Sequence, residues 1–193
     1  MTSLLLGEQS PDAARVLVVG AGGGLELVSL ATARPGWRFT GVDPSPAMLD
    51  LAREAIAPFA ERVQLIEGTV SQAPAERFDG ATCLLVLHFL ERSERLRTLQ
   101  AIHLRLKPGA RLVVAHHSPP EGRAERWMSR SAAFAAGTPA DQASAAAAGK
   151  LMTERLPMLT PAEEEDLLRA AGFVDVEQFY AALSFRGWVA SAQ

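Results

Sequence analysis

The sequence has very little cysteine and no long apolar run, and each shortage excludes a class of protein. Cys83 is the only cysteine among 193 residues, so no disulfide can form within the chain. No apolar run approaches the ~20 residues that a transmembrane helix needs, and the amino terminus lacks the basic and apolar regions of a signal peptide. We therefore expect a cytoplasmic protein without membrane association.

An excess of basic charge and a metal-ligand pattern are also missing. The formal net charge is −3 and no basic run occurs, which argues against a nucleic acid as partner. No spacing of histidine, cysteine and aspartate suggests a metal site, and the acidic residues 163–166 are expected to form a solvated helix start. With 48% hydrophobic residues, the whole chain (1–193) suits a single domain with a normal core.

What the sequence does contain is a glycine-rich turn between a buried strand and a helix. Residues 16–19 are apolar without alternation, which is typical of a strand buried on both faces of a parallel sheet. Gly20, Gly22 and Gly24 follow, and a helical pattern begins at Leu25. Glycines let a ligand approach the main chain, and the helix amino terminus offers free N–H groups. This arrangement indicates a nucleotide-binding site.

An acidic residue strengthens that interpretation. Asp43 ends the second expected strand, where its two oxygens can accept hydrogen bonds from both hydroxyls of a ribose. The structural alternative is an Asx turn before Pro44. A nicotinamide dinucleotide is disfavoured, because Leu25 and Leu27 stand where the third glycine of Gly-x-Gly-x-x-Gly would fall.

Strands are expected to alternate with helices from residue 15 to residue 117. The expected strands cover residues 15–20, 37–42, 62–67, 78–87 and 110–115, which implies right-handed crossovers and a parallel sheet. A helix over 160–171 and an antiparallel strand pair over 174–182 and 183–190 follow. Residues 119–158 form a helical insertion split by Gly137 and Pro139. It is expected to act as a lid, to provide a dimer surface, or to pack on the sheet edge.

The order and spacing of these motifs resemble those of the class I, Rossmann-like S-adenosylmethionine-dependent methyltransferases. The matching segments are residues 16–24, 40–48, 66–70, 78–88 and 106–114. The resemblance implies an α/β fold with a doubly wound, mostly parallel seven-stranded sheet, in the order 3-2-1-4-5-7-6 with the last strand antiparallel and the helical insertion after strand 5. It further implies S-adenosylmethionine as cofactor, S-adenosylhomocysteine as its product, and direct in-line methyl transfer to a small molecule.

The resemblance places the cofactor-binding residues at the carboxyl ends of the first four strands. The expected set is Gly20, Ala21, Gly22, Gly24, Asp43, Pro44, Met48, Gly68, Thr69, Val70, Leu85 and Val86. Two positions depart from the family pattern. Val18 stands where many members carry an acid in the first strand, and Thr69 stands where many carry aspartate after the glycine of the adenine-binding turn.

Three histidines are candidate catalytic bases, because they follow the fourth and fifth expected strands. These are His88, His116 and His117. A base is needed only where the methyl acceptor must lose a proton. The structural alternative is a capping or surface role for the adjacent pair and a satisfied histidine at a helix start for His88.

Other functions stay open at this point. Residues 87–95, 158–160 and 171–189 resemble, more narrowly, the carboxy-S-adenosylmethionine synthase branch. Leu151 and Leu84 stand at polar positions of that branch, so Lys150 would have to bind the extra carboxylate. A non-catalytic S-adenosylmethionine-binding module and a homodimer formed through the insertion are further possibilities.

Overall fold

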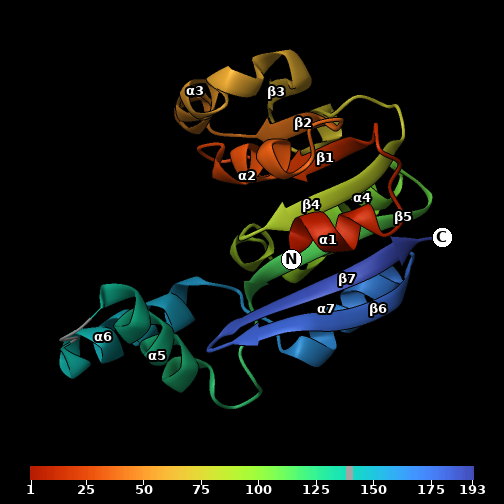
Figure 1. The fold of residues 1–193 in the computed structure, drawn as a ribbon. Coiled ribbons are helices and arrows are strands. Elements are labelled where there is room, and N and C mark those ends of the chain that lie inside the picture. The colour runs from red at the N-terminus through yellow and green to blue at the C-terminus, as the bar shows by residue number, and fades with distance from the viewer. Residues whose placement is uncertain (138–140) are drawn as a thin grey trace.

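The computed structural model describes residues 1–137 and 141–193, and its centre is a seven-stranded sheet (Figure 1). The strands are β1 (Arg15–Val19), β2 (Arg38–Asp43), β3 (Val63–Glu67), β4 (Phe78–Leu84), β5 (Leu106–His117), β6 (Phe173–Ala182) and β7 (Phe185–Ala192). Their order is β3-β2-β1-β4-β5-β7-β6. The first five strands are parallel, whereas β7 runs antiparallel to both β5 and β6. The expected strand order is confirmed.

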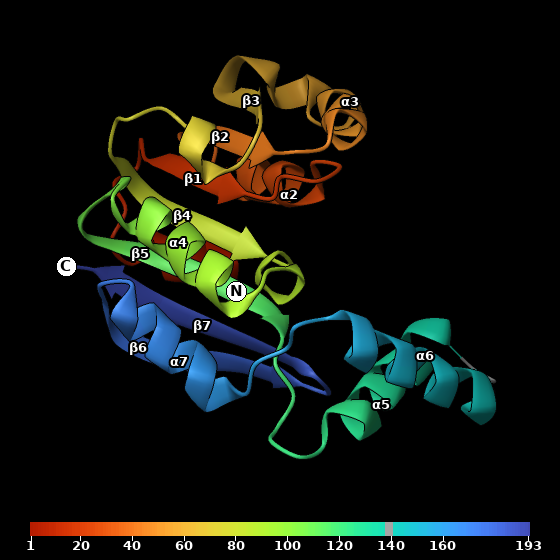
Figure 2. The same cartoon turned by 180° about the vertical axis from the view of Figure 1, so that it is seen from behind.

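Helices cover both faces of this sheet (Figures 1 and 2). One face carries α1 (Thr2–Gly7) and α2 (Leu25–Ala33), and the opposite face carries α4 (Arg92–His103) and α7 (Pro161–Ala170). The remaining helices are α3 (Pro46–Ala55), α5 (Ala124–Ala136), α6 (Gln142–Arg155) and the short 3₁₀ turns η1 (Ala57–Arg62), η2 (Val70–Gln72) and η3 (Leu87–Phe89). None of the helices in the described part of the chain is both long and apolar enough to cross a lipid bilayer.

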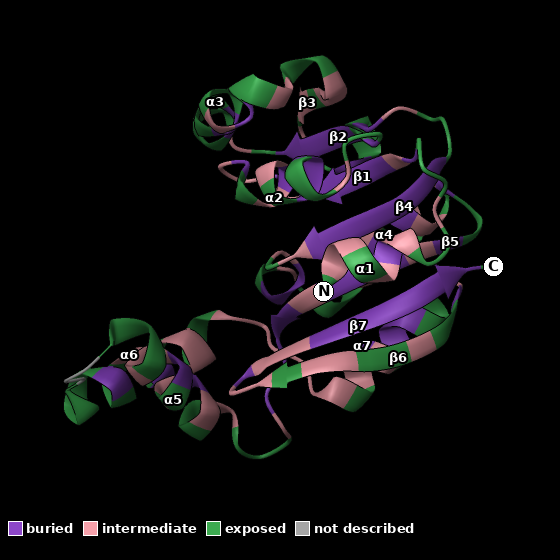
Figure 3. Ribbon diagram, in the orientation of Figure 1, coloured by how far each residue is buried: buried purple, intermediate pink, exposed green. Residues whose placement is uncertain are grey.

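Two apolar layers, one on each face, enclose the central strands, whose residues are mostly buried (Figure 3). Val16 and Val18 of β1 pack in the layer with α2, whereas Leu17 and Val19 pack in the layer with α4 and α7. All four side chains are buried. Burial on both faces explains why this strand reads as an unbroken apolar run.

Two strands, β4 and β5, differ from their expected bounds by three residues or more at one end. β4 stops at Leu84, three residues before the expected end, because Leu85 adopts a left-handed conformation (φ 60°) and η3 follows. β5 extends from residue 106 to 117 and so includes both of its terminal histidines. The early end of β4 places Leu85 and Val86 at the edge where open parallel sheets bind ligands, and the N–H of Leu85 still donates to the carbonyl of Ala115 on β5.

The insertion forms two helices that pack against each other beyond the carboxyl end of the sheet (Figure 1). α5 ends at Gly137, whose φ of 76° suits a helix stop at glycine. α6 begins after Asp141, whose side chain caps the N–H groups of Ala143 and Ser144. The expected break at Pro139 lies outside the described residues.

Candidate functional site

A cavity of about 590 Å³ lies at the carboxyl ends of β1, β2 and β4. It adjoins a smaller cavity of about 100 Å³ behind Gly68, Thr69 and Val70, and both share part of their walls. All of the expected cofactor-binding residues except Gly24 line one or both cavities. The folded chain therefore brings these separate sequence motifs together.

Gly24 serves the packing of the glycine loop and not the cavity wall. It caps α2 with a φ of 83°, and a Cβ there would lie 3.0 Å from the Cα of Ala52 on α3. Gly20 faces the cavity, and a Cβ there would lie 2.2 Å from Cγ2 of Val86. The main-chain N–H groups of Gly20 and Ala21 both donate to the carbonyl of Val42, which fixes the loop to β2.

Asp43 joins the glycine loop to the turn after β2. Its Oδ2 accepts a hydrogen bond from the N–H of Gly22 and its Oδ1 accepts one from the N–H of Ser45, each at 2.9 Å. The Asx turn is thus present, and it coexists with a contact to the loop. Each carboxylate oxygen has about two acceptor sites, so Asp43 could also hold a pair of hydroxyl groups.

The turn after β3 is closed by its own side chains. The hydroxyl of Thr69 donates to Oε1 of Gln72 (3.0 Å), and the N–H of Thr69 donates to the same oxygen (2.9 Å). This capping box engages the polar atoms of Thr69 within the turn. Gly68, with a φ of 134°, and the buried Val70 complete the wall of the smaller cavity.

Glu26 is a cavity residue that the sequence analysis missed. It lies in the first turn of α2, lines the larger cavity, and its Oε1 is buried without a hydrogen-bond partner among the described residues. Burial raises the pKa of Glu26 from 4.5 to about 7, and the nearby Thr82 hydroxyl offsets part of this effect. Acidic residues are common in the first turn of a helix, where they interact favourably with the helix dipole. The sequence around Glu26 therefore gives no sign that it lines a cavity.

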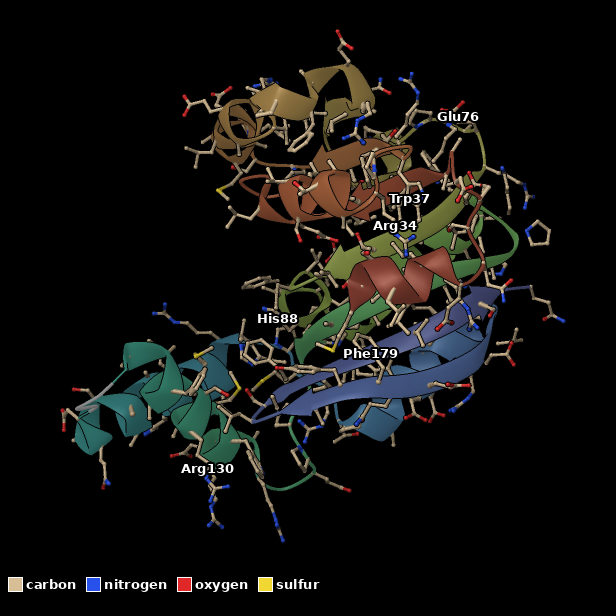
Figure 4. All side chains as sticks on the ribbon, viewed as in Figure 1. Arg34, Trp37, Glu76, His88, Arg130 and Phe179 are labelled. Atoms are coloured by element: carbon tan, nitrogen blue, oxygen red, sulfur yellow. The ribbon has the colours of Figure 1, made fainter. Side chains whose placement is uncertain are left out.

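The structure brings the three candidate histidines together, and Figure 4 labels His88, the one that is near both others. All three are buried, and the ring of His88 lies 5.1 Å from that of His117 and 6.3 Å from that of His116. None of them lines the larger cavity, although Phe89, whose ring lies 4.3 Å from that of His88, does so. Within residues 1–137 and 141–193, no three His, Cys, Asp or Glu side chains group as possible metal ligands.

His116 lies against a buried ion pair. Its Nε2 lies 2.9 Å from Oε1 of Glu164, and the same oxygen pairs with Arg95. Arg95 also donates to the carbonyls of Leu90 (3.2 Å) and Pro157 (2.7 Å). The expectation of a solvated acidic cluster is therefore wrong for Glu164, which is 1% exposed. Glu164 shares a helix face with the core residue Leu168, and Arg95 compensates its charge.

His117 has a different environment. Its ring stacks on Phe185 (3.9 Å between centroids), and its Nδ1 lies 2.7 Å from Oγ of Ser184. Burial lowers the pKa of His117 to about 4, with the neighbouring His116 as a further cause. Burial, together with both other histidines, lowers the pKa of His88 to about 3. Both rings are therefore neutral at pH 7, and pKa values this low make each a weak base.

The insertion contacts the sheet near these histidines but does not line the cavity. Ser131 of α5 is buried, with its Oγ 2.5 Å from that of Ser184. Figure 4 shows Arg130 on the outer side of α5, where it lies over the ring of Trp127. No described residue of 119–158 belongs to the lining of either cavity at the glycine loop. A lid or dimer role for the insertion stays a prediction.

A third cavity, of about 420 Å³, lies at the opposite edge of the sheet. Its lining includes Arg15, Arg38 and Glu76, and Figure 4 shows Glu76 far from His88. Arg15 and Glu76 form an ion pair there. Open parallel sheets bind ligands outside the carboxyl ends of their strands, so the glycine-loop cavity is the candidate site.

Comparisons with known proteins concern the family and the fold of this chain. Residues 17–112 match a family described as methyltransferase domain. The chain is 36% identical over 106 residues to ubiquinone biosynthesis O-methyltransferase of Xanthomonas campestris pv. campestris, covering 53% of this chain and 42% of that protein. It is 39% identical over 106 residues to the protein of the same name from Xylella fastidiosa, covering 53% and 41%. The chain thus spans less than half the length of these relatives.

Solved structures show the same fold. A putative O-methyltransferase from Nostoc punctiforme has a TM-score of 0.73 at 22% identity, covering 98% of this chain and 55% of its own. The S-adenosylmethionine-dependent methyltransferase SibL has a TM-score of 0.70 at 23% identity, covering 98% and 53%. The [4+2]-cyclase SpnF has a TM-score of 0.66 at 22% identity, covering 92% and 58%. These likenesses concern the fold alone.

Proposed function

Because this chain belongs to the class I S-adenosylmethionine-dependent methyltransferase family, we propose that it transfers a methyl group from S-adenosylmethionine to a hydroxyl oxygen of an apolar small molecule. The cavity at the glycine loop, with Asp43 held between that loop and the turn after β2, is the observation that carries the proposal. The choice of oxygen is supported by the relatives, which are named O-methyltransferases.

The residues present fit the cofactor. Asp43 has acceptor capacity for the ribose hydroxyls, and the smaller cavity at residues 68–70 suits the adenine ring. When bound, S-adenosylmethionine supplies a methyl group already activated on a positively charged sulfur. The chain then needs chiefly to align donor and acceptor and to keep water out.

The mouth of the cavity supports an apolar acceptor. Three large side chains of its lining are well exposed: Leu25 (81%), Phe89 (65%) and Leu85 (54%). Exposed apolar side chains gathered around a cavity are typical of a ligand entrance. A hydroxyl group on a hydrophobic molecule would present its apolar body to this rim.

A hydroxyl acceptor must lose a proton, but neither His88 nor His117 lines the cavity, and their low pKa values make both weak bases. Both are neutral at pH 7, and Ser184 orients His117 through Nδ1. His116 lies against Glu164 and is also absent from the cavity lining. We therefore propose that the hydroxyl proton leaves to solvent water and that the three histidines have structural roles.

Synthesis of carboxy-S-adenosylmethionine is the less favoured function. That chemistry needs a cation for an added carboxylate, but Lys150 is an exposed residue of α6, 3.9 Å from Glu154. The described lining of the larger cavity includes Glu26 and Asp43 and no lysine or arginine. An acidic wall disfavours a ligand with a second carboxylate.

The experiment measures cofactor binding and methyl transfer separately. Calorimetry with S-adenosylhomocysteine should show binding to the wild type and none to Asp43→Ala. Labelled S-adenosylmethionine should then methylate members of a panel of hydrophobic phenols, and His117→Gln should leave the rate within about threefold of wild type at unchanged cofactor affinity. Absence of binding by the wild type would sink the proposal. Transfer to matched amines but not to phenols would contradict the oxygen assignment.

A further inference from the structure

Glu26 is an acid at the cavity wall whose Oε1 has no hydrogen-bond partner in the part of the chain that the structure describes. Its Oε1 is buried without a hydrogen bond, and so is the hydroxyl of Thr82 beside it. Buried polar atoms are nearly always hydrogen-bonded, and one left unsatisfied costs roughly 1–3 kcal/mol. Because Glu26 also lines the cavity, a ligand with a donor group can satisfy it.

The charge of the cavity indicates what kind of donor this is. Among the described residues of the lining, the charged side chains are those of Glu26 and Asp43. Asp43 already accepts two main-chain hydrogen bonds, whereas Oε1 of Glu26 accepts none from the described residues. A cavity with two carboxylates and no internal cation is complementary to a positively charged group, placed on the Glu26 side.

The order of the strands gives the direction of such a ligand. Asp43 ends β2, next to the smaller cavity behind β3, while Glu26 lies beside Thr82 of β4. β1 lies between β2 and β4, and its Val18, the ladder partner of Thr82, is apolar. A nucleoside with its base at residues 68–70 and its ribose at Asp43 therefore directs its remaining end toward Glu26.

We propose that Glu26 binds the α-ammonium group of S-adenosylmethionine and so recognises the amino-acid part of the cofactor. This inference rests on the proposed function, because it takes S-adenosylmethionine to be the ligand. It assigns to the first turn of α2 an acidic contact that β1, with Val18, does not provide.

Proton release on binding gives the inference a second observable. In the ligand-free protein the pKa of Glu26 is about 7, so a fraction of the molecules carries a proton on Glu26 at neutral pH. Around it, the thiol of Cys83 on β4 stays neutral, since burial and Glu26 itself raise its pKa, and Asp43 faces the same cavity from β2. An arriving ammonium group favours the ionised form of Glu26, so binding near pH 7 should release a proton.

Calorimetry with two probes tests the inference. S-adenosylhomocysteine carries the amino-acid end, whereas 5′-methylthioadenosine has the same nucleoside and lacks that end. Glu26→Gln should weaken S-adenosylhomocysteine binding roughly 10- to 100-fold, the equivalent of one charged hydrogen bond, and leave 5′-methylthioadenosine within about twofold. Asp43→Asn is the matched control, because it should weaken both probes.

Proton release is measured from the dependence of the binding heat on the ionisation heat of the buffer. The wild type and Glu26→Asp, which keeps the charge, should release a proton, and Glu26→Gln should not. Equal affinity of Glu26→Gln and wild type for S-adenosylhomocysteine would overturn the inference and leave the proposed function standing. Failure of the wild type to bind either probe would overturn both.

Discussion

The ionisation of Glu26, a residue of the cavity wall, changes the free energy of unfolding of the protein. The unfolded chain releases the Glu26 proton near pH 4.5, whereas the folded protein retains it to about pH 7. Between these values the unfolded state binds fewer protons, so this residue lowers the free energy of unfolding as the pH rises. This decrease in the free energy of unfolding is complete above pH 7 and is absent below pH 4.

We therefore expect Glu26→Gln to stabilise the protein at pH 8 by up to roughly 3 kcal/mol, the equivalent of the pKa shift, and to have little effect at pH 4. Urea denaturation of both proteins across this range measures the difference. Glu54→Gln, at an exposed position of α3, is the control and should show no such trend. A constant difference between Glu26→Gln and wild type at all pH values would contradict the argument.

Single residues also show where sequence reasoning was limited. Asp43 was recognisable because it ends a strand beside a glycine loop, and this relation is set by local order along the chain. Glu26 was not, because its burial depends on Thr82, 56 positions later in the sequence. Glu164 was assigned to the surface for the same reason, since its partner Arg95 lies on another helix.

The helices α4 and α7 are joined by the pair of Arg95 and Glu164, which also contacts His116 of β5. Removing one member of a buried ion pair leaves an uncompensated charge, which costs about 3–5 kcal/mol. Replacing both members with apolar residues of similar size removes the charge altogether, and the cost is then small or reversed.

Glu164→Gln should accordingly lower the free energy of unfolding by about 3 kcal/mol or more, whereas the double variant Arg95→Met/Glu164→Leu should lose much less. Urea denaturation measures both. Asp166→Asn, on the exposed side of the same helix, should stay within about 0.5 kcal/mol of wild type. A double variant less stable than Glu164→Gln would show that packing, and not charge, dominates at this site.

Whole strands and helices were largely predictable, whereas their ends were not. The unbroken apolar run over residues 16–19 predicts a central strand, because a strand buried on both faces carries few polar side chains. The end of β4 at Leu84 follows from the left-handed conformation of Leu85, whose N–H donates to the carbonyl of Ala115 on β5. The left-handed conformation of Leu85 and its hydrogen bond to a distant strand do not alter the spacing of apolar residues along the sequence. The expected strand therefore extends three residues beyond the observed end of β4.

In the molecule as a whole, the proposed cofactor site is supported by residues of this chain, whereas the proposed methyl acceptor is supported less directly. Every residue of the two cavities at the glycine loop belongs to the described chain, from Val19 to Thr98. The choice of methyl acceptor is inferred from the apolar rim of the cavity and from the names of relatives of which this chain covers less than half. The order of the strands followed from the succession of motifs, but the position of the insertion, which contacts the sheet through Ser131 and Ser184, did not.

Because the cofactor cavity lies within this chain, the folded protein should be stabilised by S-adenosylhomocysteine alone. A ligand at 100 times its Kd adds about 2.7 kcal/mol to the free energy of unfolding, which for a chain of this size raises Tm by roughly 5–10 °C. Differential scanning calorimetry measures the shift. Asp43→Ala should show none at the same concentration, and Glu26→Gln a smaller one. A nicotinamide dinucleotide should leave Tm unchanged, because Leu25 and Leu27 occupy the positions of its third glycine. A rise in Tm with that dinucleotide and none with S-adenosylhomocysteine would contradict the assignment of the cavity.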